Sequence, residues 1–147
     1  MTNLIDKPRA LAFDVFGTVV DWHGGVRQEA AALAAKRGFQ GDWAAFATDW
    51  RAGYMPAMDK VRKGELPWMN IDALHRMILE QIAPKHGLAA LDEADRDHLN
   101  RAWHRLPPWP DTVPGLLRLK HQFTLTTLSN GNFSLLTNMP PEPQQGS

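Results

Sequence analysis

Two short apolar segments, each followed by a polar turn, lie on either side of a helical block of about 85 residues. The first segment, residues 10–13, is followed by Asp14, and the second, residues 123–128, is followed by Ser129. Such runs predict buried strands. Parallel strands need a crossover, which helices usually supply, so we expect the two strands to pair in parallel in an α/β fold. Asp14 and Ser129 would then lie beyond the carboxyl ends of neighbouring strands, where open α/β sheets place their reactive groups.

The segment between the strands has the apolar spacing and the boundary residues of helices. Gly38 suits the C-cap of an Ala-rich helix that begins at Gly25, and Asp42 suits the N-cap of the next helix. Pro56 is expected to end or kink that second helix. Further helices are predicted over residues 70–82, about 93–105, 113–121 and from Phe133 onwards, with a proline-rich connector at 106–115.

The composition narrows the classes of function. The chain has 147 residues, with 16 Lys and Arg against 16 Asp and Glu, so its formal net charge is zero. This balance gives no electrostatic case for nucleic acid or an anionic membrane as a partner. The absence of cysteine excludes disulfide frameworks, thiolate metal sites and cysteine nucleophiles. No apolar run has the length of a membrane span, and the first residues lack the apolar core of a secretory signal, so a cytoplasmic protein is expected.

Asp14 is a single carboxylate placed where an apolar strand stops. Held in a dry pocket and oriented by backbone N–H groups, a carboxylate can attack an electrophilic carbon or phosphorus. Thr18 is placed to hydrogen-bond it across the turn, and Val19 and Val20 are expected to extend the strand beyond the turn. The same residues also suit a turn without chemistry, in which Asp14, Gly17 and Thr18 only stabilise the turn.

The motifs in their order along the chain resemble the haloacid dehalogenase (HAD) superfamily. DVFGT follows an apolar strand, a helical insertion comes next, and a second strand ends in LSNGN, which is called the second motif below. FATDWRAGYM within the insertion is similar to the arginine-bearing helix of the type II 2-haloacid dehalogenase branch. The resemblance covers residues 8–139. It implies a partial HAD-like Rossmannoid core of parallel strands with an inserted helical cap domain.

The resemblance also implies a division of the chain into core and cap. Residues 1–20 would form the first strand and the nucleophile loop of the core, and residues 21–105 the helical cap. Residues 106–139 would return to the core with the second strand and the second motif. Residues 140–147, which are polar and rich in proline, are expected to be a disordered tail.

The residue at position 16 separates two chemistries within the superfamily. Phosphatases of this superfamily typically carry a second aspartate two residues after the nucleophile, as the general acid for the leaving group. Here that position is Phe16. A halide leaving group needs no proton and needs charge stabilisation instead, which Arg51 can supply because a guanidinium is permanently cationic.

The mechanism implied by the resemblance is hydrolytic dehalogenation of an L-2-haloacid to a D-2-hydroxyacid. Asp14 would attack C2 with inversion to form an ester, which water then hydrolyses. Ser129 and the backbone N–H groups near Val15 and Phe16 would hold the substrate carboxylate. Thr18 would support the nucleophile, and Arg51 and Asn130 would hold the halide. Candidate pocket walls are Trp50, Tyr54 and Trp68.

No cofactor and no metal are implied for this branch, and the histidines show no metal-ligand pattern. His98 and His104 are six positions apart, do not share a helical face, and receive no role. The partner is a small-molecule 2-haloacid, and a homodimer is suggested through the aromatic-rich segment 43–54.

Part of the family's pattern cannot be placed on this sequence. The family continues beyond LSNGN with a catalytic lysine and an acidic motif, and Lys120 precedes the second motif, so chain order excludes it as that lysine. The resemblance therefore implies a C-terminally truncated chain, whose two-stranded sheet we expect to be weakly stable alone. Two other interpretations stay open: a non-catalytic remnant acting as a binding or dimerisation module, and a HAD-type phosphatase using magnesium, against which Phe16 argues.

Overall fold

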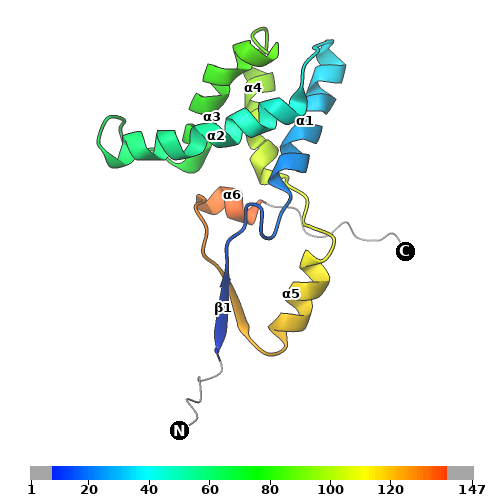
Figure 1. The fold of residues 1–147 in the computed structure, drawn as a ribbon, viewed down its shortest axis with the longest axis vertical. Coiled ribbons are helices and arrows are strands. Elements are labelled where there is room, and N and C mark those ends of the chain that lie inside the picture. Colours follow the sequence, from blue (N-terminus) through cyan, green and yellow to red (C-terminus); the bar gives the residue numbers. More distant parts are fainter. Residues whose placement is uncertain (1–7, 139–147) are drawn as a thin grey trace. The chain divides into compact units, whose positions relative to one another are not determined.

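The computed structural model describes residues 8–138, which form two compact units (Figure 1). The strand unit contains the described residues 8–21 and 108–129, and the helical unit contains 22–107 and 130–138. The predicted tail at 140–147 lies outside the described residues. Residues 130–138 group with the helical unit, whereas the sequence assigned them to the segment of the second strand. The interpretation of the units as a catalytic core and a cap stays a prediction.

The strand unit is built on one parallel pair of strands. β1 (Ala10–Phe13) pairs with β2 (Thr124–Thr127), with Ala10 opposite Thr124 and Phe13 opposite Thr127. α5 (Thr112–Lys120) precedes β2 and contacts it. The parallel pairing predicted from the sequence is confirmed.

Val19 and Val20 do not extend β1, so that prediction is wrong. The Val15 carbonyl accepts hydrogen bonds from the N–H groups of both valines, at 2.9 and 3.1 Å, which closes a tight turn instead of an extended strand. Val20 forms only isolated bridges, with Phe16 and with Pro108. The segment after Asp14 is therefore a compact loop.

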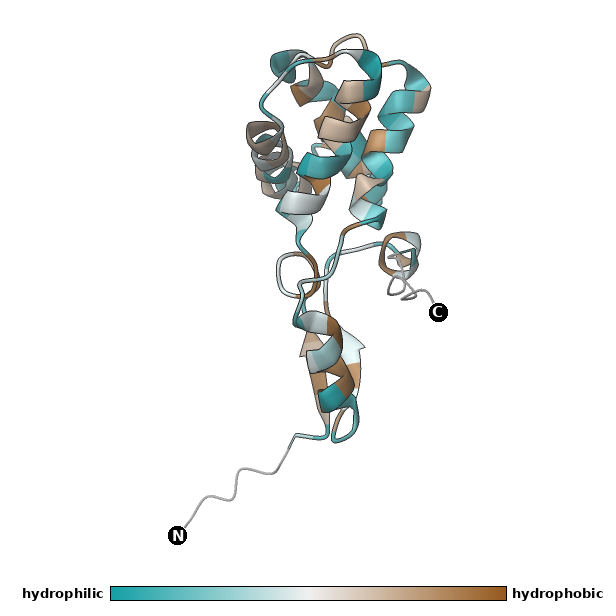
Figure 2. Ribbon diagram, turned by 90° about the vertical axis from the view of Figure 1, so that its right-hand side faces the viewer, coloured by the Kyte–Doolittle hydropathy of each residue, from teal (hydrophilic) through white to brown (hydrophobic). Residues whose placement is uncertain are grey.

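The helical unit contains amphipathic helices whose apolar faces make its core, and Figure 2 shows brown and teal residues alternating along them. The largest fully buried side chains include Phe46, Trp50, Leu74, Leu79 and Trp103. Its elements are α1 (Trp22–Arg37), α2 (Trp43–Arg62), α3 (Ile71–Ile82), the 3-10 helix η1 (Ala83–His86), α4 (Glu93–Asn100), the 3-10 helix η2 (Arg101–His104) and α6 (Phe133–Thr137).

Capping residues predicted from the sequence define several helix ends. The Asp42 side chain accepts hydrogen bonds from the N–H groups of Ala44 and Ala45 at 3.0 and 2.9 Å, which confirms it as the N-cap of α2. Gly38 follows α1 with φ +74°, the left-handed conformation expected after a helix C-terminus. α1 begins at Trp22, three residues before the predicted Gly25, and the Trp22 ring stacks on Trp103 with centroids 6.2 Å apart. This contact ties the first turn of α1 to the core.

Two predicted helix ends differ from the structure. Pro56 lies inside α2, which continues to Arg62, so of the two predicted effects an end of the helix is wrong and a kink stays a prediction. Proline removes one backbone hydrogen bond, and the burial of Tyr54 and Ala57 on either side of it offsets that loss. The single helix predicted over 93–105 is divided into α4 and the tighter η2, which places Trp103 and His104 in the interior. None of the helices within residues 8–138 is long and apolar enough to span a membrane.

Candidate active site

Asp14 and Ser129 lie side by side at the carboxyl ends of the two strands. Ser129 Oγ donates a hydrogen bond of 2.8 Å to Asp14 Oδ1, across 115 positions of sequence. The Leu128 N–H donates to the Phe13 carbonyl at 2.8 Å, so the ladder between the strands continues to the residues beside this pair. The hydroxyl holds one carboxylate oxygen, and Oδ2 has no protein partner within the described part of the chain. Asp14 is exposed, so Oδ2 can be reached from solvent.

The loop after Asp14 is fixed by its own backbone and by the segment before α5. The Gly17 N–H donates to the Val20 carbonyl at 3.0 Å, and Gly17 has φ +98°, a conformation that L side chains rarely adopt. Trp109 Nε1 donates to the Gly17 carbonyl at 3.2 Å, and Thr112 Oγ1 donates to the Val19 carbonyl at 2.8 Å. These hydrogen bonds fix the loop that Gly17, Thr18 and Val19 form after Asp14.

Thr18 makes no hydrogen bond to Asp14 within residues 8–138, contrary to the prediction. The tight turn directs it away, and it lines a cavity of about 160 Å³ together with Phe13 and Leu116 of α5. Val15 is buried at 3% exposure and Phe16 is half-buried. Whether their N–H groups bind a substrate carboxylate stays a prediction.

The remaining predicted site residues belong to the helical unit. Arg51 lies on α2 with its guanidinium carbon 4.9 Å from the centroid of the Tyr54 ring, a cation–π distance. Trp50 is fully buried, and its Nε1 donates to the His75 carbonyl at 2.9 Å. Trp68 is 84% exposed and does not share this packing, and Asn130 is exposed. The pairing of these residues with Asp14 around one ligand stays a prediction.

An aromatic column supports the Tyr54 ring on which Arg51 lies. Tyr54 contacts the His75 ring with centroids 5.9 Å apart, and His75 stacks on Trp103 at 4.3 Å. The pKa of His75 is lowered to about 3, chiefly by burial; the Asp72 carboxylate acts to raise it, and the charges of Arg51 and His104 act to lower it. His75 is therefore a neutral imidazole at neutral pH, and it adds no positive charge beneath Arg51.

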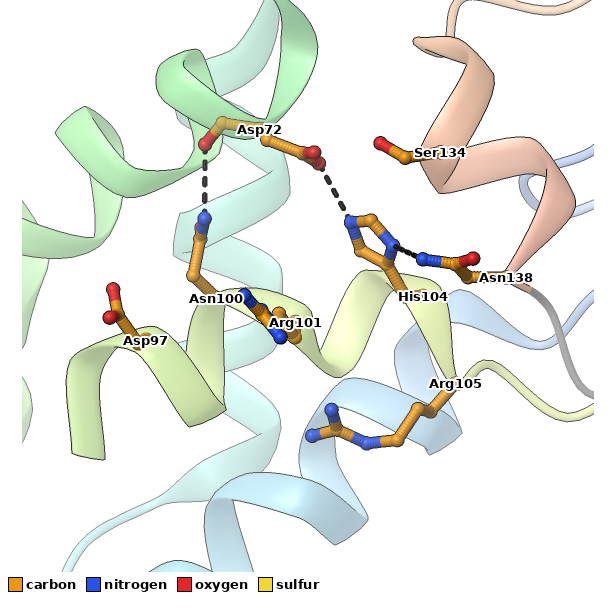
Figure 3. A pocket seen from close by; sticks show the side chains of 8 residues that line it. All are labelled: Asp72, Asp97, Asn100, Arg101, His104, Arg105, Ser134 and Asn138. Atoms are coloured by element: carbon orange, nitrogen blue, oxygen red, sulfur yellow. Dashed lines mark hydrogen bonds and ion pairs between the residues drawn. The ribbon is translucent and has the colours of Figure 1, made fainter. Parts of the chain in front are cut away.

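Sequence reasoning missed a polar network around Asp72 in the helical unit. A cavity of about 510 Å³ is lined there by polar and charged side chains from α3, α4, η2 and the segment that follows Asn132 (Figure 3). His104, which received no role, lies 2.9 Å from Asp72, and His98 lies 3.3 Å from Glu29. No spacing rule could have found the first pair, because its members are 32 positions apart.

Glu29 forms ion pairs with Arg105 and His98 beside this network. Its pKa is lowered chiefly by the hydrogen bonds and the charge of Arg105, with a smaller contribution from His98, against the opposing effect of burial. Within residues 8–138, no three His, Cys, Asp or Glu side chains gather as a metal site requires.

Comparison with solved structures finds L-2-haloacid dehalogenases. The chain matches a defluorinating L-2-haloacid dehalogenase with a TM-score of 0.84 and 43% sequence identity, over 90% of this chain and 55% of that one. For another L-2-haloacid dehalogenase the values are 0.83 and 44%, over 90% and 57%. For the L-2-haloacid dehalogenase from Xanthobacter autotrophicus they are 0.73 and 25%, over 90% and 51%.

The helices and the parallel two-stranded sheet of this chain match the α/β fold of these structures, which confirms the predicted fold class. The chain spans a little more than half of the length of the structures that it matches. No protein-family model matches the chain, and no curated protein matches it either.

Proposed function

We propose that this chain carries the nucleophile of a hydrolase, on the premise that it belongs to the haloacid dehalogenase superfamily. This hydrolase acts on the carbon–halogen bond of L-2-haloacids. One observation carries the proposal: the 2.8 Å hydrogen bond from Ser129 to Asp14 at the ends of adjacent parallel strands. The identity of 43% and 44% to two L-2-haloacid dehalogenases supports the choice of substrate. Phe16, in place of a second acid, also favours a leaving group that needs no proton.

The geometry of the carboxylate suits nucleophilic attack by one particular oxygen. Ser129 Oγ–H engages Oδ1, so Oδ2 would attack C2 of the haloacid while the carbon–halogen bond breaks and the halide leaves with the bonding electrons. The product of this step is an ester between Asp14 and the acid. Water would then attack the Asp14 carboxyl carbon, release the 2-hydroxyacid and restore the carboxylate. Because Asp14 is exposed here, substrate binding must displace water from it before attack becomes efficient.

The other roles follow from charge and position. Arg51, held over the Tyr54 ring, would stabilise the departing halide together with Asn130. The backbone N–H groups at Val15 and Phe16 would hold the substrate carboxylate, because the one hydroxyl proton of Ser129 is given to Asp14. Thr18 would act only through the loop that it belongs to, because it does not bond Asp14. Trp50, Tyr54 and Trp68 stay candidate walls, of which Trp50 is packed as core.

Halide release from L-2-chloropropionate by the full chain tests the proposal. We expect release that is lost in Asp14→Asn and kept in Asp111→Asn, which makes the same change at an exposed aspartate of the same unit. With enzyme in excess in ¹⁸O-labelled water, the first turnover should give unlabelled hydroxyacid, because its new oxygen comes from Asp14. Label in the product of the first turnover would contradict an ester intermediate. Equal release by the two variants would contradict Asp14 as the nucleophile.

A second candidate function is a non-catalytic binding or dimerisation module. The observation that favours it is the exposure of large apolar side chains of the helical unit, with Met55 53% and Trp68 84% exposed. A chain that folds cooperatively, forms a dimer in light-scattering measurements and releases no halide would favour this module over the enzyme. A cytoplasmic location is part of both proposals and can be tested by fractionation of cells.

A further inference from the structure

The carboxylate of Asp72, in the first turn of α3, binds side chains from two distant parts of the sequence. Its Oδ1 lies 2.9 Å from His104 Nε2, and its Oδ2 accepts a hydrogen bond of 2.9 Å from Asn132 Nδ2. Asn100 Nδ2 donates to the Asp72 backbone carbonyl at 3.1 Å. Both carboxylate oxygens are thus engaged, by partners 32 and 60 positions away.

The donors and acceptors of this network define one arrangement of protons. A carboxylate only accepts, so Asn132 must present its amide nitrogen and His104 its Nε2–H. His104 Nδ1 lies 3.3 Å from Asn138 Nδ2, a donor, so this contact requires Nδ1 to accept. The bonds therefore run from Asn138 through His104 to Asp72, as the dashed lines of Figure 3 show.

The two ends of this network lie at the two ends of one short helix. α6 runs from Phe133 to Thr137, so Asn132 precedes its first residue and Asn138 follows its last. A helix of five residues is far below the length that is stable by itself in water. Leu135 is its one fully buried side chain, whereas Phe133 is 84% exposed. Polar ties at both ends therefore carry much of what holds α6 in place.

We propose that Asp72 is a positioning residue for the second motif. It ties the start of α6 directly, through Asn132, and the end of α6 indirectly, through His104 and Asn138. Asn130 is two residues before Asn132, so the same tie limits where Asn130 can lie. The inference rests on the proposed function only for the role of Asn130 toward the halide. The two ties from Asp72 to the ends of α6, together called the clamp, can be measured without turnover.

Amide hydrogen exchange in Asp72→Asn tests the clamp. The Leu136 and Asn138 N–H groups bond to the carbonyls of Asn132 and Ser134 at 3.1 and 3.0 Å, so they report opening of α6. We expect their exchange to accelerate roughly 10-fold to 100-fold, the range given by losing one hydrogen bond to a charged group. The Leu74 N–H, bonded to the Asn70 carbonyl at the start of α3, should be unchanged.

The imidazole of His104 gives a second signal that a general loss of packing would not produce. In the parent chain its ¹⁵N shifts should show the proton on Nε2. In Asp72→Asn the new NH₂ group must face either Asn132 Nδ2 or the Nε2–H of His104, and both of these are donors. We therefore expect a second tautomer of His104, with the proton on Nδ1, in this variant. Asp97→Asn is the matched control: Asp97 lines the same cavity but bonds Arg76 instead, and this variant should match the parent in both measurements.

The role toward Asn130 has its own measurement. If the parent chain releases halide, Asp72→Asn should lower kcat while KM stays within about twofold, because Asn130 is proposed to act on the leaving group and not on the carboxylate. A kcat equal to that of Asp97→Asn, with faster α6 exchange, would overturn the positioning role. A parent chain without activity counts against the proposed function alone, because exchange and tautomer still decide the clamp.

Unchanged exchange at Leu136 and Asn138 in Asp72→Asn would overturn the clamp. If exchange accelerates across α3 as well, the variant has lost more than the clamp, and Asn132→Ala then decides, since it removes one tie and leaves α3 intact. The proposal requires faster exchange at Leu136 in that variant and a double variant with Asp72→Asn that is less than additive. Full additivity would overturn it.

Discussion

Acidification should destabilise the helical unit through His75, and the size of the effect can be worked out. The imidazole is 4% exposed, stacked on Trp103, and its Nδ1 is buried without a hydrogen-bond partner within the described residues. Burial lowers its pKa to about 3 from 6.5. Below pH 6.5 His75 binds a proton in the unfolded chain, whereas in the folded chain it stays neutral down to about pH 3, so protonation favours unfolding. Stability is therefore lost as the pH falls from 6.5 toward 3.

Between pH 7.5 and pH 5.0 this single group should lower the free energy of unfolding by about 2 kcal/mol. The comparison is with His75→Phe, which keeps an aromatic ring against Trp103 and cannot titrate. Other titrating groups are common to both chains, so the difference between their pH dependences isolates His75. The absolute stability of the variant does not enter, which matters because phenylalanine is the larger side chain.

Urea unfolding followed by tryptophan fluorescence provides the assay, because Trp50 and Trp103 are both almost fully buried in this unit. The parent chain should lose about 2 kcal/mol more than His75→Phe over that pH interval. Parallel losses in the two chains would refute the reasoning, since they would mean that the folded interior accepts the proton as readily as water does.

Four further substitutions have defined outcomes. Gly53→Ala should lower the urea midpoint by an amount equivalent to about 1–3 kcal/mol, because the added Cβ would lie 2.5 Å from Ile78 Cγ2. Gly115→Ala should instead raise the free energy of unfolding by about 0.5–1 kcal/mol, because the space around this position of α5 is open. Asp42→Ala should cost about 1 kcal/mol in the same assay through loss of the α2 N-cap, and no change would contradict the capping role. Ser129→Ala should slow halide release roughly 10-fold to 100-fold with an unaltered urea midpoint, and an unaltered rate would argue that the hydroxyl does not orient the nucleophile.

The sequence sufficed to predict features that local chemistry or chain topology decides. Asp42 was predictable as a cap because capping depends on one side chain and the next three residues. The meeting of Asp14 and Ser129 was predictable because parallel strands bring their carboxyl ends together whatever separates them in the sequence.

Features decided by tertiary contacts could not be predicted. The passage of α2 through Pro56 depends on burial of neighbours that propensity ignores. The orientation of Thr18 depends on which carbonyl closes the turn, and two N–H groups compete for Val15. The contact of Asp72 with His104 joins residues 32 apart, and no pattern in one sequence marks such a pair.

The way in which the helical unit begins and ends has a consequence for the order of folding. A Cβ on Gly25 would lie 3.5 Å from Leu106 Cα, so the entry and exit of the insertion run against each other. For an unstructured chain, bringing together strands separated by about 110 residues costs roughly 4 kcal/mol of closure entropy from the length term alone. Once the helices have assembled, the chain between the strands is effectively reduced to residues 14–24 and 107–123, and the length term falls by about 1 kcal/mol. The strands should accordingly be the last part of this chain to assemble and the first to separate.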